Sequence, residues 1–143
     1  MDIEWLLIAD SAQVVGNKLY LLGGGWDTAF INQPFPAPYS FAVAVAFKVP
    51  WDQTNQQHPF EIEVQDDDGN QMLSAKGQLE VGRPPGALPG SPQRAQAAAN
   101  IGMEVRKPGN FVIIARADGE EGGRFPFRIV AGPNVQAAQT PAS

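Results

Sequence analysis

The chain contains no cysteine, and its 143 residues include a single histidine, His58. A disulfide framework, a cysteine nucleophile and a cysteine-ligated zinc site are therefore excluded. His58 has no second histidine to share a metal with, and no Gly-x-Ser-x-Gly segment accompanies it. We therefore predict that the protein is not an enzyme and that it holds no metal or other cofactor.

Basic residues are also scarce. Ten lysines and arginines stand against 15 acidic residues, which gives a formal net charge of −5 and a pI near 4.7. A negative protein with no basic stripe is repelled by phosphate backbones, so we expect no nucleic-acid partner.

Long apolar runs are missing. The run Trp5–Ala9 is far shorter than the roughly 20 residues that cross a bilayer, and acidic residues flank it where a secretory signal would carry basic ones. We expect no membrane association and a cytoplasmic location, with which the absence of cysteine agrees.

Long amphipathic helices are absent as well, and turn residues recur at short intervals instead. The segment 60–65 alternates apolar and polar residues, breaks at Asp66-Asp67-Asp68-Gly69-Asn70 and resumes at Met72, a pattern typical of a half-buried hairpin. Repeated along the chain, this pattern predicts an all-β protein of about eight or nine strands, arranged as a two-sheet β-sandwich or jelly roll. We expect one domain over residues 1–131 and a flexible tail over 132–143.

One segment is ambiguous. Residues 93–100 are rich in alanine and glutamine, which favour a helix after the Ser91-Pro92 pair. A helix this short with only alanine to bury is marginal, so we prefer a strand from about residue 97 to 105.

The strand expected at residues 40–49 has an unusual outer face. Phe41, Val43, Val45 and Phe47 share one side, whereas the other side carries Ala42, Ala44 and Ala46. A solvated face normally carries polar groups, so these alanines indicate that another layer packs closely over them. That layer is either a segment of the same chain or a second subunit. We predict an interface at these three alanines.

The polar loop over residues 51–58 is the best candidate for ligand binding. Trp51 offers an aromatic surface, Asp52 and Asn55 offer hydrogen-bonding groups, and His58 closes the loop. The alternative is structural, because Asp52 and Asn55 can each close an Asx turn and His58 can make a loop hydrogen bond.

Two acidic groups are interpreted as structural. The cluster Asp66–Asp68 lacks the ligand spacing of an EF-hand, and its Asp-Gly pair is a common hairpin turn, so we expect no calcium effect. Glu61 and Glu63 alternate with core residues on the wet face of their strand, and we interpret them as solvated charges.

Two segments of the chain stand out together, Gly23-Gly24-Gly25-Trp26-Asp27 and Pro50-Trp51-Asp52-Gln53-Thr54-Asn55-Gln56-Gln57-His58. With them the chain resembles a family of small uncharacterised bacterial proteins, a domain of unknown function. The resemblance extends to the turns at Asp67-Asp68-Gly69 and Pro108-Gly109, and it covers most of the chain except the tail. It implies membership but no activity, because the family has none to carry over.

We therefore expect a non-enzymatic binding or assembly module whose partner is a second copy of itself, in a homo-oligomer, or another protein. The alternative function is binding of a small ligand or carbohydrate at the 51–58 loop.

Overall fold

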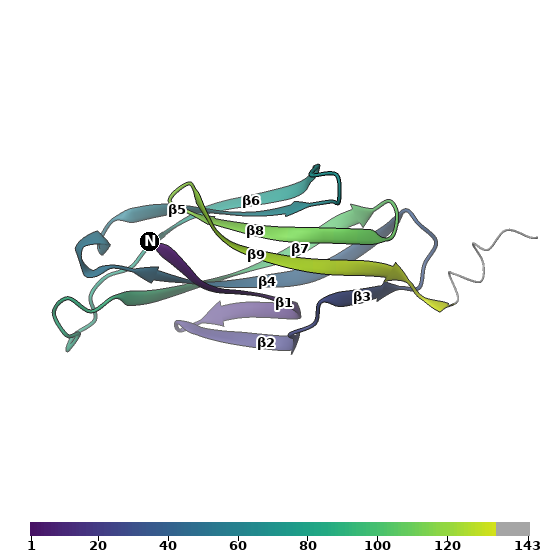
Figure 1. The fold of residues 1–143 in the computed structure, drawn as a ribbon. Coiled ribbons are helices and arrows are strands. Elements are labelled where there is room, and N and C mark those ends of the chain that lie inside the picture. Colours follow the sequence, from purple (N-terminus) through teal and green to yellow (C-terminus); the bar gives the residue numbers. More distant parts are fainter. Residues whose placement is uncertain (134–143) are drawn as a thin grey trace, which may run out of the picture.

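The computed structural model of the protein describes residues 1–133. Within them the chain forms nine strands in two sheets and one short 3-10 turn, η1 (Trp51–Gln53). The first sheet has the order β2 (Lys18–Gly24), β1 (Asp2–Val15), β4 (Ala37–Val49) and β7 (Gln93–Val105). The second has the order β3 (Thr28–Ile31), β9 (Glu120–Ala131), β8 (Gly109–Ala117), β5 (Gln57–Gln65) and β6 (Gln71–Glu80). The predicted all-β, two-sheet architecture is confirmed (Figure 1). The tail expected at 132–143 lies almost wholly outside the described residues.

All strand pairs are antiparallel except β3 and β9, which run in parallel with Thr28 opposite Arg128. β1 and β2 form the first hairpin of the chain, and β1 extends six residues beyond Ala9, where the apolar run Trp5–Ala9 ends. β2 and β3 follow one another in the chain but lie at the margins of different sheets (Figure 1).

The core lies between the sheets. The side of β4 that carries the larger side chains faces this core, as predicted. The buried residues on that side are Phe41, Val43, Val45 and Phe47. Phe41 meets Phe127 of β9 at 5.4 Å between ring centroids, and Phe127 stacks with Phe111 of β8 at 5.5 Å. Each such side chain contributes about 1.5–3 kcal/mol when fully buried, so this layer dominates the stability of the fold.

The ambiguous alanine segment is strand throughout, as preferred from the sequence. β7 begins at Gln93, and every one of its 13 residues is paired with a residue of β4. Pairing with β4 along its full length satisfies the backbone groups of β7 that face β4, and this tertiary pairing outweighs the local preference of alanine for helix. The strand therefore starts earlier than the residue 97 expected from composition.

Candidate functional site

The alanine side of β4 is covered by the chain itself. Ala42, Ala44 and Ala46 are each 0% exposed. Ala42 and Ala44 pack with Ala12, and the side chains that close over this small cluster are Trp5, Leu7, Leu19 and Ala98, while Trp5 lies directly opposite Ala46. The predicted interface at Ala42, Ala44 and Ala46 therefore needs correction: within one chain these side chains have no surface left for a partner to touch.

The strands that flank β4 also bond to each other across its outer face. Arg94 of β7 donates two hydrogen bonds to the carboxylate of Glu4 in β1, at 2.7 and 2.6 Å. The same contact lowers the pKa of Glu4. Near the β1–β2 turn, Gln96 donates to the carbonyl of Asn17 at 3.1 Å. Because alanine side chains are short, β1 and β7 can meet over the strand between them.

Exposed large apolar side chains gather on the β1–β2 hairpin, although Phe30 and Leu88 are exposed elsewhere. Leu22 is 72% exposed and Tyr20 is 53% exposed. In the register of the hairpin they lie opposite Ser11 and Gln13, which are also exposed, so the four side chains share the solvent face of this ribbon. We call this surface the hairpin face. β2 is the terminal strand of its sheet, and no other strand of residues 1–133 pairs with its outer edge (Figure 1).

The 51–58 loop opens with η1, and Arg83 fixes it in place. The guanidinium of Arg83 lies 3.8 Å from the centroid of the Trp51 ring. It also donates to the Trp51 carbonyl at 2.6 Å and to the Thr54 hydroxyl at 2.8 Å. Thr54 in turn donates to the same Trp51 carbonyl at 2.8 Å. The two hydrogen bonds therefore anchor the guanidinium to the loop, and the cation–π contact places it over the indole.

His58 lies inside the fold, at 5% exposure. Its Nδ1 is 2.9 Å from a carboxylate oxygen of Asp118, and its Nε2 is 2.8 Å from the carbonyl oxygen of Gln53. The Met1 ammonium completes the group, 3.0 Å from the other Asp118 oxygen and 2.7 Å from the Gln53 side chain. Burial of Asp118 disfavours its charge, but His58 and the ammonium outweigh this and lower the pKa of Asp118. His58 therefore ties η1 to the β8–β9 turn and faces no open surface.

Asn55 also has a structural position. Its backbone is left-handed, with φ 59°, and its backbone N–H donates to the Val81 carbonyl at 2.8 Å. Of the four loop residues predicted to bind a ligand, only Trp51 and Asp52 reach a common depression. Its volume is about 420 Å³, and its lining includes Asp2, Lys48, Pro50, Trp51, Asp52 and Pro92. We call it the Trp51 pocket.

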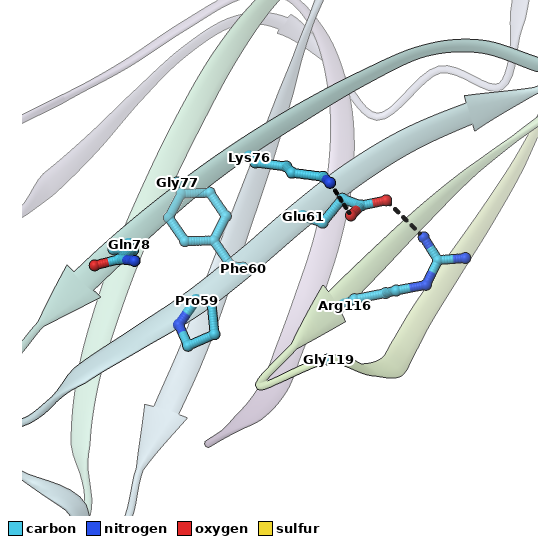
Figure 2. Close-up of a pocket in the computed structure, with 8 residues that line it drawn as sticks. All are labelled: Pro59, Phe60, Glu61, Lys76, Gly77, Gln78, Arg116 and Gly119. Atoms are coloured by element: carbon cyan, nitrogen blue, oxygen red, sulfur yellow. Dashed lines mark hydrogen bonds and ion pairs between the residues drawn. The ribbon is translucent and has the colours of Figure 1, made fainter.

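A second depression, of about 540 Å³, lies between β5, β6 and the β8–β9 turn (Figure 2). Its charged groups already have partners. Glu61 accepts from Arg116 at 3.0 Å and lies 3.8 Å from the ammonium of Lys76. The Phe60 ring lies over Gly77, so close that a Cβ there would approach a ring carbon to 2.7 Å. With its charges paired, this depression keeps the side-chain amide of Gln78 as an uncharged group that could orient a ligand.

The interpretation of Glu63 as a solvated charge is wrong, because its side chain is buried. Its residue exposure is 7%, and its carboxylate accepts from Gln65 at 2.9 Å and from Arg116 at 2.6 Å. These hydrogen bonds lower the pKa of Glu63, with Gln65 contributing most. Ile114, directly opposite Glu63, is fully buried on the same outer face. A charged network therefore covers an apolar residue there, which alternation in β5 alone does not reveal.

The acidic turn at residues 66–70 is stabilised by one of its own carboxylates, that of Asp66. Asp66 accepts hydrogen bonds from the backbone amides of Asn70 and Asp68 at 2.9 and 3.0 Å. The Asn70 contact is the main cause of the lowered pKa of Asp66. Gly69 has φ 80°, as the predicted turn requires. Within residues 1–133 no group of three or more His, Asp or Glu side chains is placed to hold a metal ion.

Sequence reasoning missed Arg83 and the hairpin face. Arg83 stands in a proline-rich segment, and nothing in that segment signals a contact with Trp51. The apolar residues of β2 were visible, but a single sequence does not show which of them remain outside the core. No helix within residues 1–133 has the length and hydropathy needed to cross a bilayer.

Comparison with known proteins places the chain in a family without giving it an activity. No curated protein matches it significantly. Among solved structures it is similar to the Pseudomonas fluorescens alkylpurine DNA glycosylase AlkC bound to DNA containing an abasic site analog, with 12% sequence identity and a TM-score of 0.39. That match covers 87% of this chain but only 30% of the glycosylase chain. The model of a family of unknown function, DUF6941, matches residues 4–130. The chain therefore belongs to the DUF6941 family, in agreement with the resemblance found in its sequence.

Proposed function

We propose that the protein is a non-enzymatic assembly module that binds a second copy of itself through the open edge of β2. The observation that carries this proposal is the combination, on one strand, of an unpaired backbone edge and large exposed apolar side chains. Native proteins generally protect such an edge, because its free amides and carbonyls pair with any other edge strand.

The edge is self-complementary when two copies of β2 run antiparallel about a two-fold axis. With Leu21 on the axis, Tyr20 of each copy lies opposite Leu22 of the other. The aromatic–aliphatic contact is thereby made twice, and both pairs lie on the hairpin face. The two four-stranded sheets would then join into one continuous sheet.

Charge also favours this orientation. Lys18 begins β2, and the carboxylate of Asp10 lies over Gly23 near its end. Antiparallel pairing brings the lysine end of each strand to the aspartate end of the other, whereas parallel pairing sets like charges side by side.

The test is the oligomeric state across concentration, measured by light scattering and analytical ultracentrifugation. We expect wild type to dimerise at micromolar concentrations, and Leu22→Lys to remain monomeric because it places two lysines in the apolar pairs. Leu88→Lys is the matched control, since Leu88 is 75% exposed but lies in a loop away from β2. A wild-type protein that stays monomeric up to about 100 μM contradicts the proposal. So does a dimer that Leu22→Lys leaves intact.

The remaining expectations accompany this proposal. A cytoplasmic location, the absence of a nucleic-acid partner and the lack of enzymatic activity stay predictions. Another protein with an open strand edge is the alternative partner, and a monomeric wild type would direct attention to it.

A further inference from the structure

The Trp51 pocket is a surface site made by four separate segments. Asp2 comes from the start of β1, Lys48 from the end of β4, Trp51 and Asp52 from η1, and Pro92 from the loop before β7. Its volume of about 420 Å³ falls within the range of about 300–1,000 Å³ seen for small-ligand sites.

The charged groups of this pocket have no close partner among residues 1–133, although the charge of Lys48 acts on Glu4 and helps to lower the pKa of that carboxyl. The side chains of Asp2, Lys48 and Asp52 take part in no hydrogen bond or ion pair with the described residues. The neighbouring Glu4, by contrast, is bound to Arg94. The pocket therefore presents two carboxylates that accept hydrogen bonds and one ammonium that donates them, all at the surface.

The indole of Trp51 is held rigid beside these groups. Arg83 lies over the ring at 3.8 Å and binds the Trp51 backbone, and Trp51, which is half-buried, also lines the pocket. A fixed aromatic surface loses little entropy on binding, and the adjacent Pro50 and Pro92 extend its apolar area.

From this arrangement we propose that the Trp51 pocket binds a neutral carbohydrate. The apolar face of a sugar ring packs against indole and proline, and its hydroxyls donate to carboxylates and accept from ammonium. Two acids and one base give the pocket a negative balance within a chain of net charge −5, which opposes phosphorylated or acidic ligands. The residues that carry this site are Trp51, Asp52, Asp2 and Lys48, with Arg83 as a positioning residue. This proposal is independent of self-association at β2.

The experiment is a titration of the ¹⁵N-labelled protein with cellotriose, maltotriose and triacetylchitotriose, followed through the indole resonances of the three tryptophans. We expect at least one of these sugars to shift the Trp51 resonance saturably while the Trp26 resonance stays unchanged. Trp51→Ala should lower the affinity about tenfold or more.

Two charge variants separate binding from folding. Lys48→Gln removes a proposed donor, whereas Lys76→Gln removes an exposed lysine of the other sheet and serves as the control. Weaker binding in Lys48→Gln with unchanged binding in Lys76→Gln supports the site, provided that both variants melt as wild type does. The proposal is overturned if no sugar gives a saturable shift up to about 10 mM. Binding that survives both Trp51→Ala and Lys48→Gln overturns it equally.

Discussion

The imidazole of His58 and the carboxylate of Asp118 join two segments 60 positions apart, through a contact of 2.9 Å between Nδ1 and Oδ1. Both ring nitrogens of His58 lie within hydrogen-bond distance of an oxygen atom, Nδ1 of the Asp118 carboxylate and Nε2 of the Gln53 carbonyl. This group links the start of β5 to the β8–β9 turn and holds η1 against the body of the sandwich.

Asp118 is expected to make folding sensitive to acid. Because its pKa is lower in the folded state, its contribution to stability is present above the unfolded aspartate pKa of about 3.9 and is lost as pH falls through the folded value. Asp118→Asn should cost about 1 kcal/mol near neutral pH, since the carboxylate side chain is 36% exposed and partly screened by water. The difference from wild type should shrink below about pH 4.

Urea unfolding between pH 2 and 7 measures this effect. Asparagine also tolerates the left-handed backbone of residue 118, so the substitution removes charge without adding strain. Asp67→Asn, in an exposed turn, is the control and should leave the pH profile unchanged. An Asp118→Asn profile parallel to that of wild type over the whole range would rule out this role.

Gly77 is expected to tolerate no side chain. A Cβ there would lie 2.7 Å from a ring carbon of Phe60, whose ring also packs against Phe47 at 5.3 Å in the core. Gly77→Ala should therefore destabilise the protein by about 1–3 kcal/mol through overpacking.

Gly102→Ala is the matched control, because Gly102 is also a strand glycine but its Cβ would meet nothing closer than 3.7 Å. Thermal and urea unfolding of both variants check the contrast. Equal stabilities for the two would show that the Phe60 ring moves aside freely.

The acidic turn is expected to depend on its glycine and not on calcium. Gly69 has φ 80°, and a Cβ added to it would meet no atom within 4 Å. Gly69→Val should therefore lower the free energy of unfolding by about 1 kcal/mol or more through backbone strain alone. Millimolar calcium should leave the melting temperatures of wild type and Gly69→Val unchanged, because backbone amides of the same turn already donate to the Asp66 carboxylate. A calcium-dependent rise of several degrees that disappears in Asp66→Asn would overturn this interpretation.

The alanine side of β4 is expected to resist enlargement. Ala44 is fully buried on the outer face, so Ala44→Leu should destabilise by about 1–3 kcal/mol. Ala98 lies directly opposite on β7 and is only partly buried, and Ala98→Leu should cost less because its side chain can turn toward solvent. Unfolding in urea compares the two. A milder effect at Ala44 than at Ala98 would mean that the layer over β4 opens easily.

Local patterns explain which parts of the fold the sequence predicts. The hairpin of β5 and β6 depends on alternation and one turn, and both lie within about 25 consecutive residues. Alternation along the sequence also distinguishes the two sides of β4, one with large apolar side chains and one with alanines. What covers its alanine side was not predictable, because that depends on how the β1–β2 hairpin folds back beside β7.

In the candidate site, too, the sequence predicts what depends on neighbouring residues but not what depends on distant contacts. Trp51, Asp52, Asn55 and His58 are close in sequence, and this closeness suggested one site. Their orientations are decided elsewhere: Arg83, 32 positions away, fixes Trp51, and Asp118 draws His58 inward. A single sequence carries no sign of these long-range partners, so the loop was found but its roles were not separated.

The burial of β4 on both sides has an effect on how the molecule opens. Its amides bond to β1 and β7, and both sides of the strand are buried from Phe41 to Phe47. Partial opening of β2, which lies at the margin of this sheet opposite β7, leaves β1 in place beside β4. The amide hydrogens of β4 that bond to β1 should therefore exchange with solvent only through global unfolding, so their exchange rates report the stability of the whole domain.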